Sequence, residues 1–418
     1  MTSFSNNDLI RRLVFSLFVG AASMSQARAD IAVEAHAGKH DRVNAIASFV
    51  LPAELAEAPR ISIEPVDGDK SVPIRSQITR SEGKATLTWI IPGELKADSS
   101  RSFTVTSVAP AKGGHSYVLS EKSDDHLTIT VNKNLVLKYN MVTNQPPQGA
   151  NKLFARSGYI HPVMTPGGRL ITNDFPEKHL HHHGIWFPWT ETTFEGKKTD
   201  FWNSAKGEGT VEFVKLEDHA SGDVFASFRV QQKHVALKTV KGKKDVLNES
   251  WEVRVYGNEK FHIFDLTSTQ TCAGESPLML KTYHYGGLGV RGSADWEGED
   301  DACKFLTSEG LTRANGHATT AKWCAVSGII KEADGGKPAG IAILGHPSNF
   351  RFPQKMRIHP SEPFFNFAPS QDGDFEIVPG KPYVSRYRFV VFDGETDGKL
   401  CEKLWADFAE PVEVKVVK

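Results

Sequence analysis

The sequence predicts an all-β protein, with a small N-terminal β-sandwich followed by a large antiparallel β-supersandwich. Short runs of alternating apolar and polar residues recur along the chain, separated by Gly, Pro, Asp and Asn. A period of two is typical of strands that bury one face. Neither a βαβ alternation nor a glycine-rich phosphate loop occurs, which argues against a nucleotide-binding fold.

The individual strand signals follow one another through the whole chain. We expect strands over residues 85–91, 102–108, 126–131, 134–139, 209–216, 223–231, 250–257, 261–269, 340–346 and 386–393. One helix is expected from Thr396 onward, because apolar residues between Leu400 and Phe408 fall at helical spacing and Pro411 ends the pattern. Helix content should therefore stay below about a fifth of the chain.

Three segments are expected. Arg11 and Arg12 precede an apolar run over 13–24, and Ala27-Arg28-Ala29 has the small-x-small pattern of a signal peptidase site. We therefore expect a signal peptide over 1–29, cleaved near Ala29, and a secreted or periplasmic product. The flexible APAKGG stretch at 109–114 predicts a boundary between a small sandwich over 30–112 and a large domain over 113–418 that includes the helix.

Composition narrows the possible partners. With 49 basic and 50 acidic residues the chain has no strong field, so nucleic-acid binding is not expected. The apolar N-terminal run is too short to span a bilayer and no later run is longer, so no membrane insertion is expected. Four cysteines without CxxC spacing leave open two disulfides or free thiols.

The segment KHLHHHGIWFPW, residues 178–189, places four histidines in five positions. Histidine titrates near neutrality and is the commonest transition-metal ligand, so such a cluster indicates proton transfer or metal binding. If the segment is extended, His179, His181 and His183 share one face, and His182 lies on the other with Trp186. The first three are therefore candidate ligands of a divalent metal.

Four clusters combine His, Arg or Asn with aromatic residues, at 158–189 with 200–203, at 283–292, at 345–353 and at 358–369. Aromatic rings stack on sugar C–H faces, while planar polar groups bind hydroxyls, so this combination predicts a carbohydrate site. We expect the clusters to converge on one concave surface. The candidate substrate-binding residues are His161, Arg169, Trp186, Trp202, Tyr283, Arg291, His346, Asn349, Arg351 and His359.

General acid–base chemistry on a sugar needs a proton donor and an acceptor. By context His182 and His284 are the best candidates, with Asp174 as the carboxylate. Glu191, Asp265 and Glu362 remain alternatives for the carboxylate.

The order YIHPV, a Gly-Arg turn, TNDFP, HLHHHGIWF, DFW, GGLGVR and HPSN resembles a bacterial domain family labelled "PmoA", of unknown function and common in secreted proteins. The resemblance covers about residues 115–393. The label implies a subunit of the membrane-bound methane monooxygenase, which the absence of a transmembrane segment argues against. The resemblance also implies a galactose mutarotase-like supersandwich, a fold of many sugar-active enzymes that use a histidine acid and a carboxylate base.

Three functions follow from these patterns. The leading hypothesis is an exported carbohydrate-active enzyme of the hydrolase, lyase or epimerase type, with His and carboxylate acid–base chemistry. The alternatives are a metal-dependent enzyme with a His-cluster site and a non-catalytic carbohydrate-binding protein. Substrate, reaction type and oligomeric state stay open.

Overall fold

The computed structural model describes residues 30–67, 70–71, 73–109, 116–298, 302–333 and 335–417. Strands make up 52% and helices 8%, so the predicted all-β class and low helix content are confirmed. The predicted signal peptide over 1–29 lies outside the described residues. So does most of the predicted boundary at 109–114, because the description stops after residue 109 and resumes at 116.

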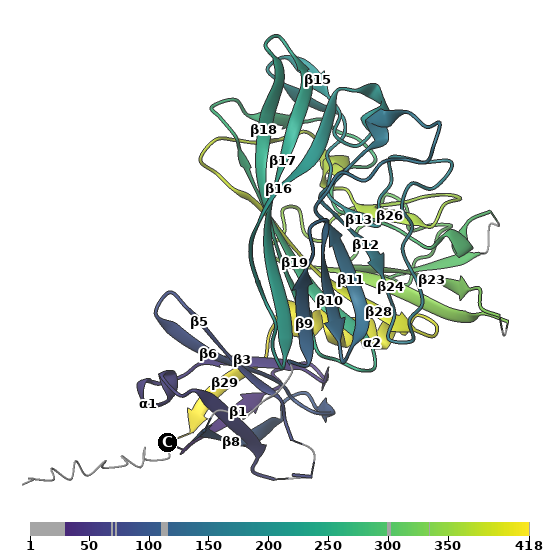
Figure 1. Cartoon of the computed structure of the whole chain (residues 1–418). Helices are drawn as coiled ribbons and strands as arrows, with labels where there is room; N and C mark the ends of the chain where they lie inside the picture. Colours follow the sequence, from purple (N-terminus) through teal and green to yellow (C-terminus); the bar gives the residue numbers. More distant parts are fainter. Residues whose placement is uncertain are drawn as a thin grey trace, which may run out of the picture.

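The small unit is a sandwich of short antiparallel sheets, seen at the lower left of Figure 1. One sheet has the order β29 (Glu413–Val417), β1 (Asp30–His36), β8 (Ser100–Val108), β4 (Arg60–Pro65). The other has the order β3 (Ile46–Val50), β6 (Lys84–Ile90), β5 (Ser76–Ser81), and a small ladder joins β2 (Arg42–Val43) to β7 (Glu94–Leu95). The short helix α1 (Ala53–Ala56) follows β3. In the core of the small sandwich, the rings of Trp89 and Phe103 pack edge to face, with ring centroids 5.7 Å apart.

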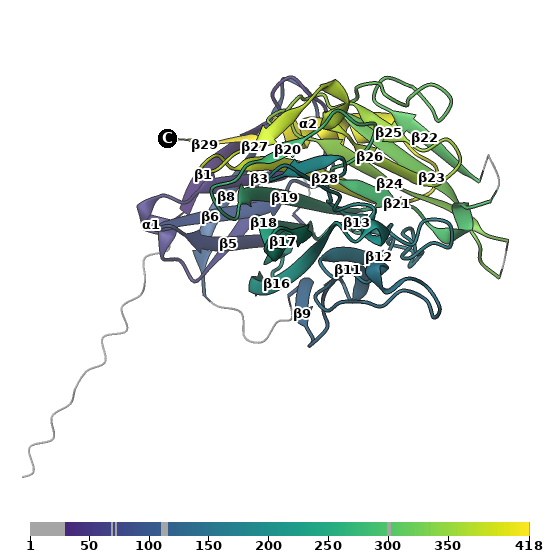
Figure 2. The same ribbon diagram turned by 90° about the horizontal axis from the view of Figure 1, so that it is seen from above.

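Two eight-stranded antiparallel sheets form the large unit, which lies to the right of the small unit in Figure 2. The first sheet has the order β25 (Met356–Ile358), β26 (Phe364–Phe367), β21 (Gly289–Arg291), β13 (Ile185–Trp186), β12 (Tyr159–Val163), β11 (Asn134–Asn140), β10 (His126–Val131), β9 (Val118–Lys122). The second has the order β16 (Gly209–Ala220), β17 (Phe225–Thr239), β18 (Gly242–Tyr256), β19 (His262–Cys272), β28 (Tyr383–Asp393), β24 (Lys337–Gly345), β23 (Trp323–Ile330), β22 (Cys303–Thr307).

The alternating sequence pattern explains how these sheets face each other. In β10 the residues Leu127, Ile129 and Val131 are buried, and the residues between them are less so. Because successive side chains point to opposite faces of a strand, this alternation gives the sheet one apolar face. The apolar faces of the two sheets meet in a single large core, where the ring of Tyr139 contacts those of Phe228 and Trp251.

Smaller elements complete the large unit. A four-stranded sheet has the order β15 (Lys197–Thr199), β14 (Thr192–Phe194), β20 (Leu278–Leu280), β27 (Phe375–Ile377). Single 3-10 turns are η1 (Lys152–Phe154), η2 (Ser204–Lys206), η3 (Ala294–Trp296) and η4 (Pro369–Asp372). All ten strand regions expected from the sequence are strands here, with longer bounds in most cases.

The predicted helix is confirmed as α2 (Gly398–Ala409). The Asp397 side chain accepts hydrogen bonds from the main-chain N–H groups of Lys399 and Leu400, which caps the first turn. On its inner face Leu404 is buried in a cluster with Trp323 and other residues of the second large sheet. The helix therefore covers an apolar face of that sheet.

The end of the chain differs from the predicted division at residue 112. Strand β29 pairs antiparallel with β1, from Ala32 opposite Val417 to His36 opposite Glu413. The last strand thus belongs to the small sandwich, and it lies beside the N-terminal strands in Figure 1. Buried Arg42 also donates to the Asp407 carboxylate at 2.9 Å, which ties β2 to α2.

All four cysteines are free thiols. Within the described part of the chain, no helix has both the length and the apolar character needed to cross a membrane.

Candidate functional site

The loop of residues 173–184 carries the histidine cluster, and it is fixed on both sides to β21. Asn173 N donates to Arg291 O at 3.1 Å, and Arg291 N donates to Gly184 O at 2.8 Å. Gly184 is required at this crossing, because a Cβ there would lie 2.2 Å from Ile160 O. The two ends of the loop are therefore held by the sheet.

Within this loop the chain turns and is not extended. Asp174 and His183 form an antiparallel bridge, and Phe175 N donates to His182 O at 3.1 Å. Two further turns follow, with His179 N bonded to Pro176 O and His182 N bonded to His179 O. The expected alternation of histidines between two faces is wrong, because these turns replace the strand.

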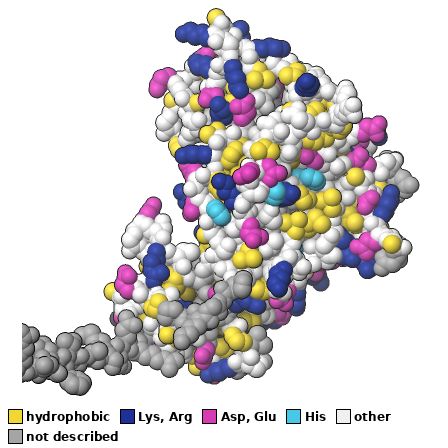
Figure 3. Space-filling view, viewed as in Figure 1, with side chains coloured by type: hydrophobic (Ala, Val, Ile, Leu, Met, Phe, Trp, Pro, Cys, Tyr) yellow, Lys and Arg dark blue, Asp and Glu magenta, His cyan; other side chains and the backbone are white. Residues whose placement is uncertain are grey.

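The turns bring three of the four histidines into one pocket with residues from β25, β26 and two other loops. The pocket has a volume of about 240 Å³. It is lined by His179, His181, His182, Trp202, Asn203, His284, Tyr285, Arg357, His359 and Phe364. In Figure 3 histidine side chains (cyan) reach the surface of the large unit beside hydrophobic and charged groups.

The imidazole rings are in mutual contact. His182 lies 4.6 Å from His181 and 4.9 Å from His179, measured between ring centroids. His359, which follows β25, lies 5.5 Å from His179. Among the described residues, Nδ1 of His179 and Nδ1 of His182 are buried without a hydrogen-bond partner.

Burial keeps these histidines neutral at pH 7. Burial, together with neighbouring positive charge such as that of Arg291 and Arg357, lowers the pKa of His181 to about 3 and that of His359 to about 4. Burial also places the pKa of His182 well below its usual value. His284, which is exposed at the pocket, has its pKa lowered by partial burial and then by Arg357.

The tautomer of His359 follows from its neighbours. Its Nδ1 accepts main-chain hydrogen bonds from Glu362 N at 3.0 Å and Ser361 N at 3.3 Å. A neutral imidazole carries one N–H, so the proton of His359 is on Nε2. This residue can donate a hydrogen bond through Nε2.

Aromatic rings form the wall behind the histidines. His182 contacts Trp186 at 5.1 Å and Phe364 at 4.8 Å between ring centroids. Trp202 packs on Trp186 at 5.0 Å and on Tyr285 at 5.2 Å. Trp186 is fully buried and does not line the pocket, whereas Trp202 does.

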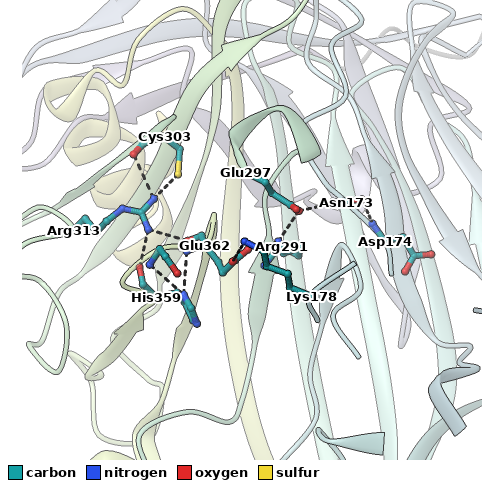
Figure 4. A network of polar contacts seen from close by, with 10 residues as sticks. Asn173, Asp174, Lys178, Arg291, Glu297, Cys303, Arg313, His359 and Glu362 are labelled. Carbon is teal, nitrogen blue, oxygen red and sulfur yellow. Dashed lines mark hydrogen bonds and ion pairs between the residues drawn. The ribbon is translucent and has the colours of Figure 1, made fainter. Parts of the chain in front are cut away.

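Figure 4 shows a charged network that reaches the pocket at His359. Arg291 is fully buried and donates to Glu297 at 2.6 Å and to Glu362 at 2.7 Å. Arg313 donates to the main-chain oxygens of His359 and Glu362. Arg291, expected to bind substrate, instead holds the strands and the 359–362 turn that carry the site.

The predicted carboxylate Asp174 lies outside the lining of the pocket. It accepts from His183 Nδ1 at 2.7 Å and from the Tyr159 hydroxyl at 2.7 Å. Burial alone would raise the pKa of Asp174, but the bonds from His183 and Tyr159 outweigh it and lower the pKa. With both oxygens engaged, Asp174 orients His183 and does not line the pocket.

Residues of the 345–353 cluster do not line the pocket. His346 contacts Phe408 of α2, with ring centroids 5.0 Å apart, and Asn349 bonds the main chain of Arg386. Arg351 donates to the oxygens of Pro369 and Gly373. This loop docks α2 and η4 onto the sheets.

Three further candidates have partners within the fold. His161 on β12 bonds Thr172 Oγ1 at 3.0 Å. Arg169 forms an ion pair with Asp393. Tyr283 packs on His284 at 4.3 Å, beside the pocket but not in its lining. The predicted convergence thus brings together the clusters at 179–182, 202–203, 284–285 and 359–364, and leaves the 345–353 cluster apart.

The three predicted metal ligands do not converge. His179 and His181 line the pocket, but His183 packs between Tyr159 and Phe175 and donates to Asp174. In the described ranges, no group of three or more His, Cys, Asp or Glu side chains is arranged to hold a metal ion. The residues present therefore do not fit the predicted metal centre.

Sequence reasoning missed four lining residues: Asn203, Tyr285, Arg357 and Phe364. Asn203, Tyr285 and Phe364 lie inside motifs that the sequence analysis identified, but other residues of those motifs were predicted to bind the substrate. Arg357 is preceded and followed by buried Met356 and Ile358 on the short strand β25. The sequence did offer one signal for Arg357, because it is a single charged residue between two apolar residues just before the His359 motif.

The fold and the pocket together define a β-sandwich protein with a histidine-lined site at the edge of its first large sheet. A family of unknown function, DUF6807, matches residues 126–406, which is more than half of the chain, and the chain belongs to this family. The match covers every residue that lines the pocket. No similar protein was found among curated sequences.

Proposed function

We propose that the chain is an exported carbohydrate-active enzyme whose neutral histidines act on a sugar bound in the pocket. The observation that carries this proposal is the lining, where the rings of Trp202, Tyr285 and Phe364 lie beside imidazoles and the Asn203 amide. Sugars offer C–H faces to rings and hydroxyls to planar polar groups. The unpartnered Nδ1 atoms of His179 and His182 add free hydrogen-bonding capacity.

The lining also favours one kind of chemistry. Hydrolysis by most glycosidases needs two carboxylates across the scissile bond, and no Asp or Glu lines the described pocket. A neutral imidazole can instead remove a proton, because its nitrogen is already unprotonated at pH 7. Of the three reaction types considered, the lyase and epimerase types fit better than the hydrolase type.

His284 is our candidate for the general base. Its side chain is exposed at the pocket, and its pKa lies below the usual value, so it is neutral near pH 7. His359 is the candidate hydrogen-bond donor to the bound sugar, because its proton is on Nε2. His182, predicted earlier as a catalytic partner, is buried among aromatic rings and serves better as the floor of the site.

We also propose that the large unit has a galactose mutarotase-like fold and that the chain is related to the "PmoA"-labelled domain family. Support for the fold name comes from two large antiparallel sheets packed face to face. Fold likeness alone is a prior for sugar chemistry, and the argument rests on the site. The methane monooxygenase role that the label implies forms no part of the proposal.

A saccharide screen with the chain from Asp30 onward tests the proposal. Neutral, acidic and oxidised oligosaccharides are incubated with wild type and with His284→Gln, with and without added Zn²⁺ or Mn²⁺. We expect turnover by wild type without added metal, and loss of turnover in the variant. Saccharide binding without turnover would favour the non-catalytic binding protein, and turnover only with metal would favour the metalloenzyme.

A further inference from the structure

Arg357 is a charged group in the pocket without a counter-charge. It lies on the edge strand β25, and among the described residues its guanidinium has one hydrogen-bond partner, His317 Nε2 at 3.4 Å. No carboxylate of the described residues forms an ion pair with it. The groups that act electrostatically on Arg357 are the hydroxyls of Tyr285 and Tyr283. A guanidinium stays protonated at every physiological pH, so the charge is permanent.

Four other arginines of the large unit bond to carboxylates or to main-chain oxygens of the fold. Arg388 makes two bonds to Asp265, at 2.7 and 2.9 Å, and Arg291 bonds both Glu297 and Glu362. Arg351 and Arg313 lack a carboxylate but donate to two or more main-chain oxygens. Half-burying a charge without such partners is unfavourable, so Arg357 is retained against a cost in stability.

The rest of the pocket strengthens its positive character. The histidines are neutral and no acidic side chain lines the described pocket, so Arg357 supplies the only formal charge of the lining. Two acidic groups that act on the pocket histidines are each paired with a cation, since Asp200 bonds Lys206 at 2.7 Å and Glu362 bonds Arg291. The free site therefore complements an anion.

We propose that Arg357 binds the carboxylate of a uronic acid residue, which makes the substrate an acidic saccharide. This inference rests on the proposed sugar function and names its substrate class. The planar guanidinium matches a carboxylate with two parallel hydrogen bonds. Sulfate and phosphate esters share this geometry, but a carboxylate is preferred here because it acidifies the adjacent C5–H bond, which a neutral imidazole can then attack.

The reaction balances with the residues present. His284 takes the C5 proton, and the electron pair delocalises into the carboxylate held by Arg357. In elimination this pair forms the C4=C5 bond, the C4–O bond breaks, and the leaving oxygen takes the proton from protonated His284. In epimerisation C5 takes a proton from water on its opposite face, protonated His284 releases its proton to the solvent, and no bond to oxygen breaks. Neither path needs an oxidant or a reductant.

Binding of matched ligands tests the inference. Glucuronate, galacturonate and mannuronate oligosaccharides are titrated against wild type, each beside its methyl ester, which keeps the shape and removes the charge, and beside a sulfated oligosaccharide. We expect at least one acid to bind about tenfold or more tightly than its ester, a typical effect of a charge-assisted hydrogen bond. Arg357→Gln should abolish this difference. The control Arg229→Gln, which removes the same charge from an exposed position on β17, should retain it.

The outcomes separate the two proposals. Equal binding of acids and esters to wild type would overturn the uronate inference and leave the sugar function standing. Preference for sulfated over carboxylated saccharides would overturn it too and identify a different anion. Failure of every saccharide to bind would contradict the proposed function and this inference together. An acid preference that survives in Arg357→Gln would place the anion on another residue.

Discussion

At the residue scale, the site depends on histidines that burial holds neutral. A neutral imidazole offers a lone pair and one N–H, whereas a protonated ring offers only donors. Because rings such as His181 and His182 lie 4.6 Å apart, protonating several of them would place like charges in contact. The pocket therefore suits proton abstraction near neutrality and loses this capacity in acid.

His284→Gln tests the role of the candidate base. We expect a fall in kcat of about 100-fold or more, because a positioned base contributes this much to proton transfer. The free energy of unfolding should stay the same, since the side chain is exposed. The matched control is His219→Gln, an exposed position on β16 outside the pocket. Equal losses in both variants, or unfolding of His284→Gln, would contradict a catalytic role.

The pH profile of activity follows from the same residue. The pKa of His284 lies below 6.5, so kcat/KM should be level at and above pH 7 and should fall only below 6.5. Measuring kcat/KM on the acid side gives the pKa directly. A fall that begins above pH 7 would show that His284 is not the base in the free enzyme.

Stability should also depend on pH through His181. Its pKa is about 3 in the folded protein against an ordinary 6.5, so between these values only the unfolded chain binds the proton. Stability is therefore fully present above pH 6.5 and falls as the pH drops below it, by about 2 kcal/mol at pH 5. In urea denaturation at pH 7.5 and pH 5, His181→Gln should lose less stability than wild type. An identical pH dependence would refute the assignment.

At the element scale, the 173–184 loop is positioned by its crossing of β12 and β21. Main-chain bonds from Asn173 and to Gly184 hold its ends to Arg291, and the charged network beneath β21 holds the 359–362 turn. The site is therefore built on strands and on short turns that these strands fix. Substitutions at the crossing should damage binding and folding together.

Gly184→Ala tests this crossing. The added Cβ would lie 2.2 Å from Ile160 O and 2.9 Å from His161 Cβ, so β12 and β13 must move apart. We expect a loss of about 1–3 kcal/mol in unfolding free energy, with loss of ligand binding. The control Gly274→Ala has open space around its Cβ and should behave like wild type. A stable Gly184→Ala protein with normal binding would contradict the described packing.

Arg291→Leu separates a scaffold arginine from the proposed ligand arginine. It would leave the carboxylates of Glu297 and Glu362 without their shared cation, at a cost of about 3–5 kcal/mol. Thermal denaturation should show this loss, whereas Arg357→Gln should fold normally and lose only acid binding. If Arg291→Leu were as stable as wild type and only saccharide binding were impaired, Arg291 would be a substrate-binding residue, as the sequence predicted.

At the scale of the whole molecule, the C-terminal strand joins the two units. After α2 packs on the second large sheet, β29 pairs with β1 and places Val412 in the core of the small sandwich. Removing residues 411–418 should destabilise the small sandwich by about 2 kcal/mol or more, since it exposes apolar surface and the edge of β1. Hydrogen exchange of the β1 amides measures the effect. Unchanged exchange would show that β29 contributes little.

The fold was largely predictable, and the site only in part. Period-two runs such as HLTITV identify strands directly, because burial of one face imposes that period. No local pattern assigns the last strand to the small sandwich, since EVKVV pairs with β1, whose residues lie almost 400 positions earlier. The turn at 176–182 was missed because closely spaced histidines do not themselves distinguish a strand from a turn.

The errors in the site have a common physical cause. His346, Asn349 and Arg351 have the polar and aromatic character of a binding loop, but the same groups serve to dock α2 and η4. Arg291 and Arg357 are both strand arginines with apolar neighbours, and only their spatial partners separate a buried ion pair from a free guanidinium. Such partners come from distant segments, which a single sequence does not reveal.

Histidine side-chain NMR during saccharide titration tests the central claim most directly. In protein labelled with ¹⁵N at the imidazole rings, the ligand-free protein should show neutral rings at pH 7 for the pocket histidines, with the His359 proton on Nε2. A uronate oligosaccharide should then shift the signals of His181, His284 and His359 and leave those of His219 and His346 unchanged. Protonated pocket rings at pH 7, or shifts confined to histidines outside the pocket, would contradict the account.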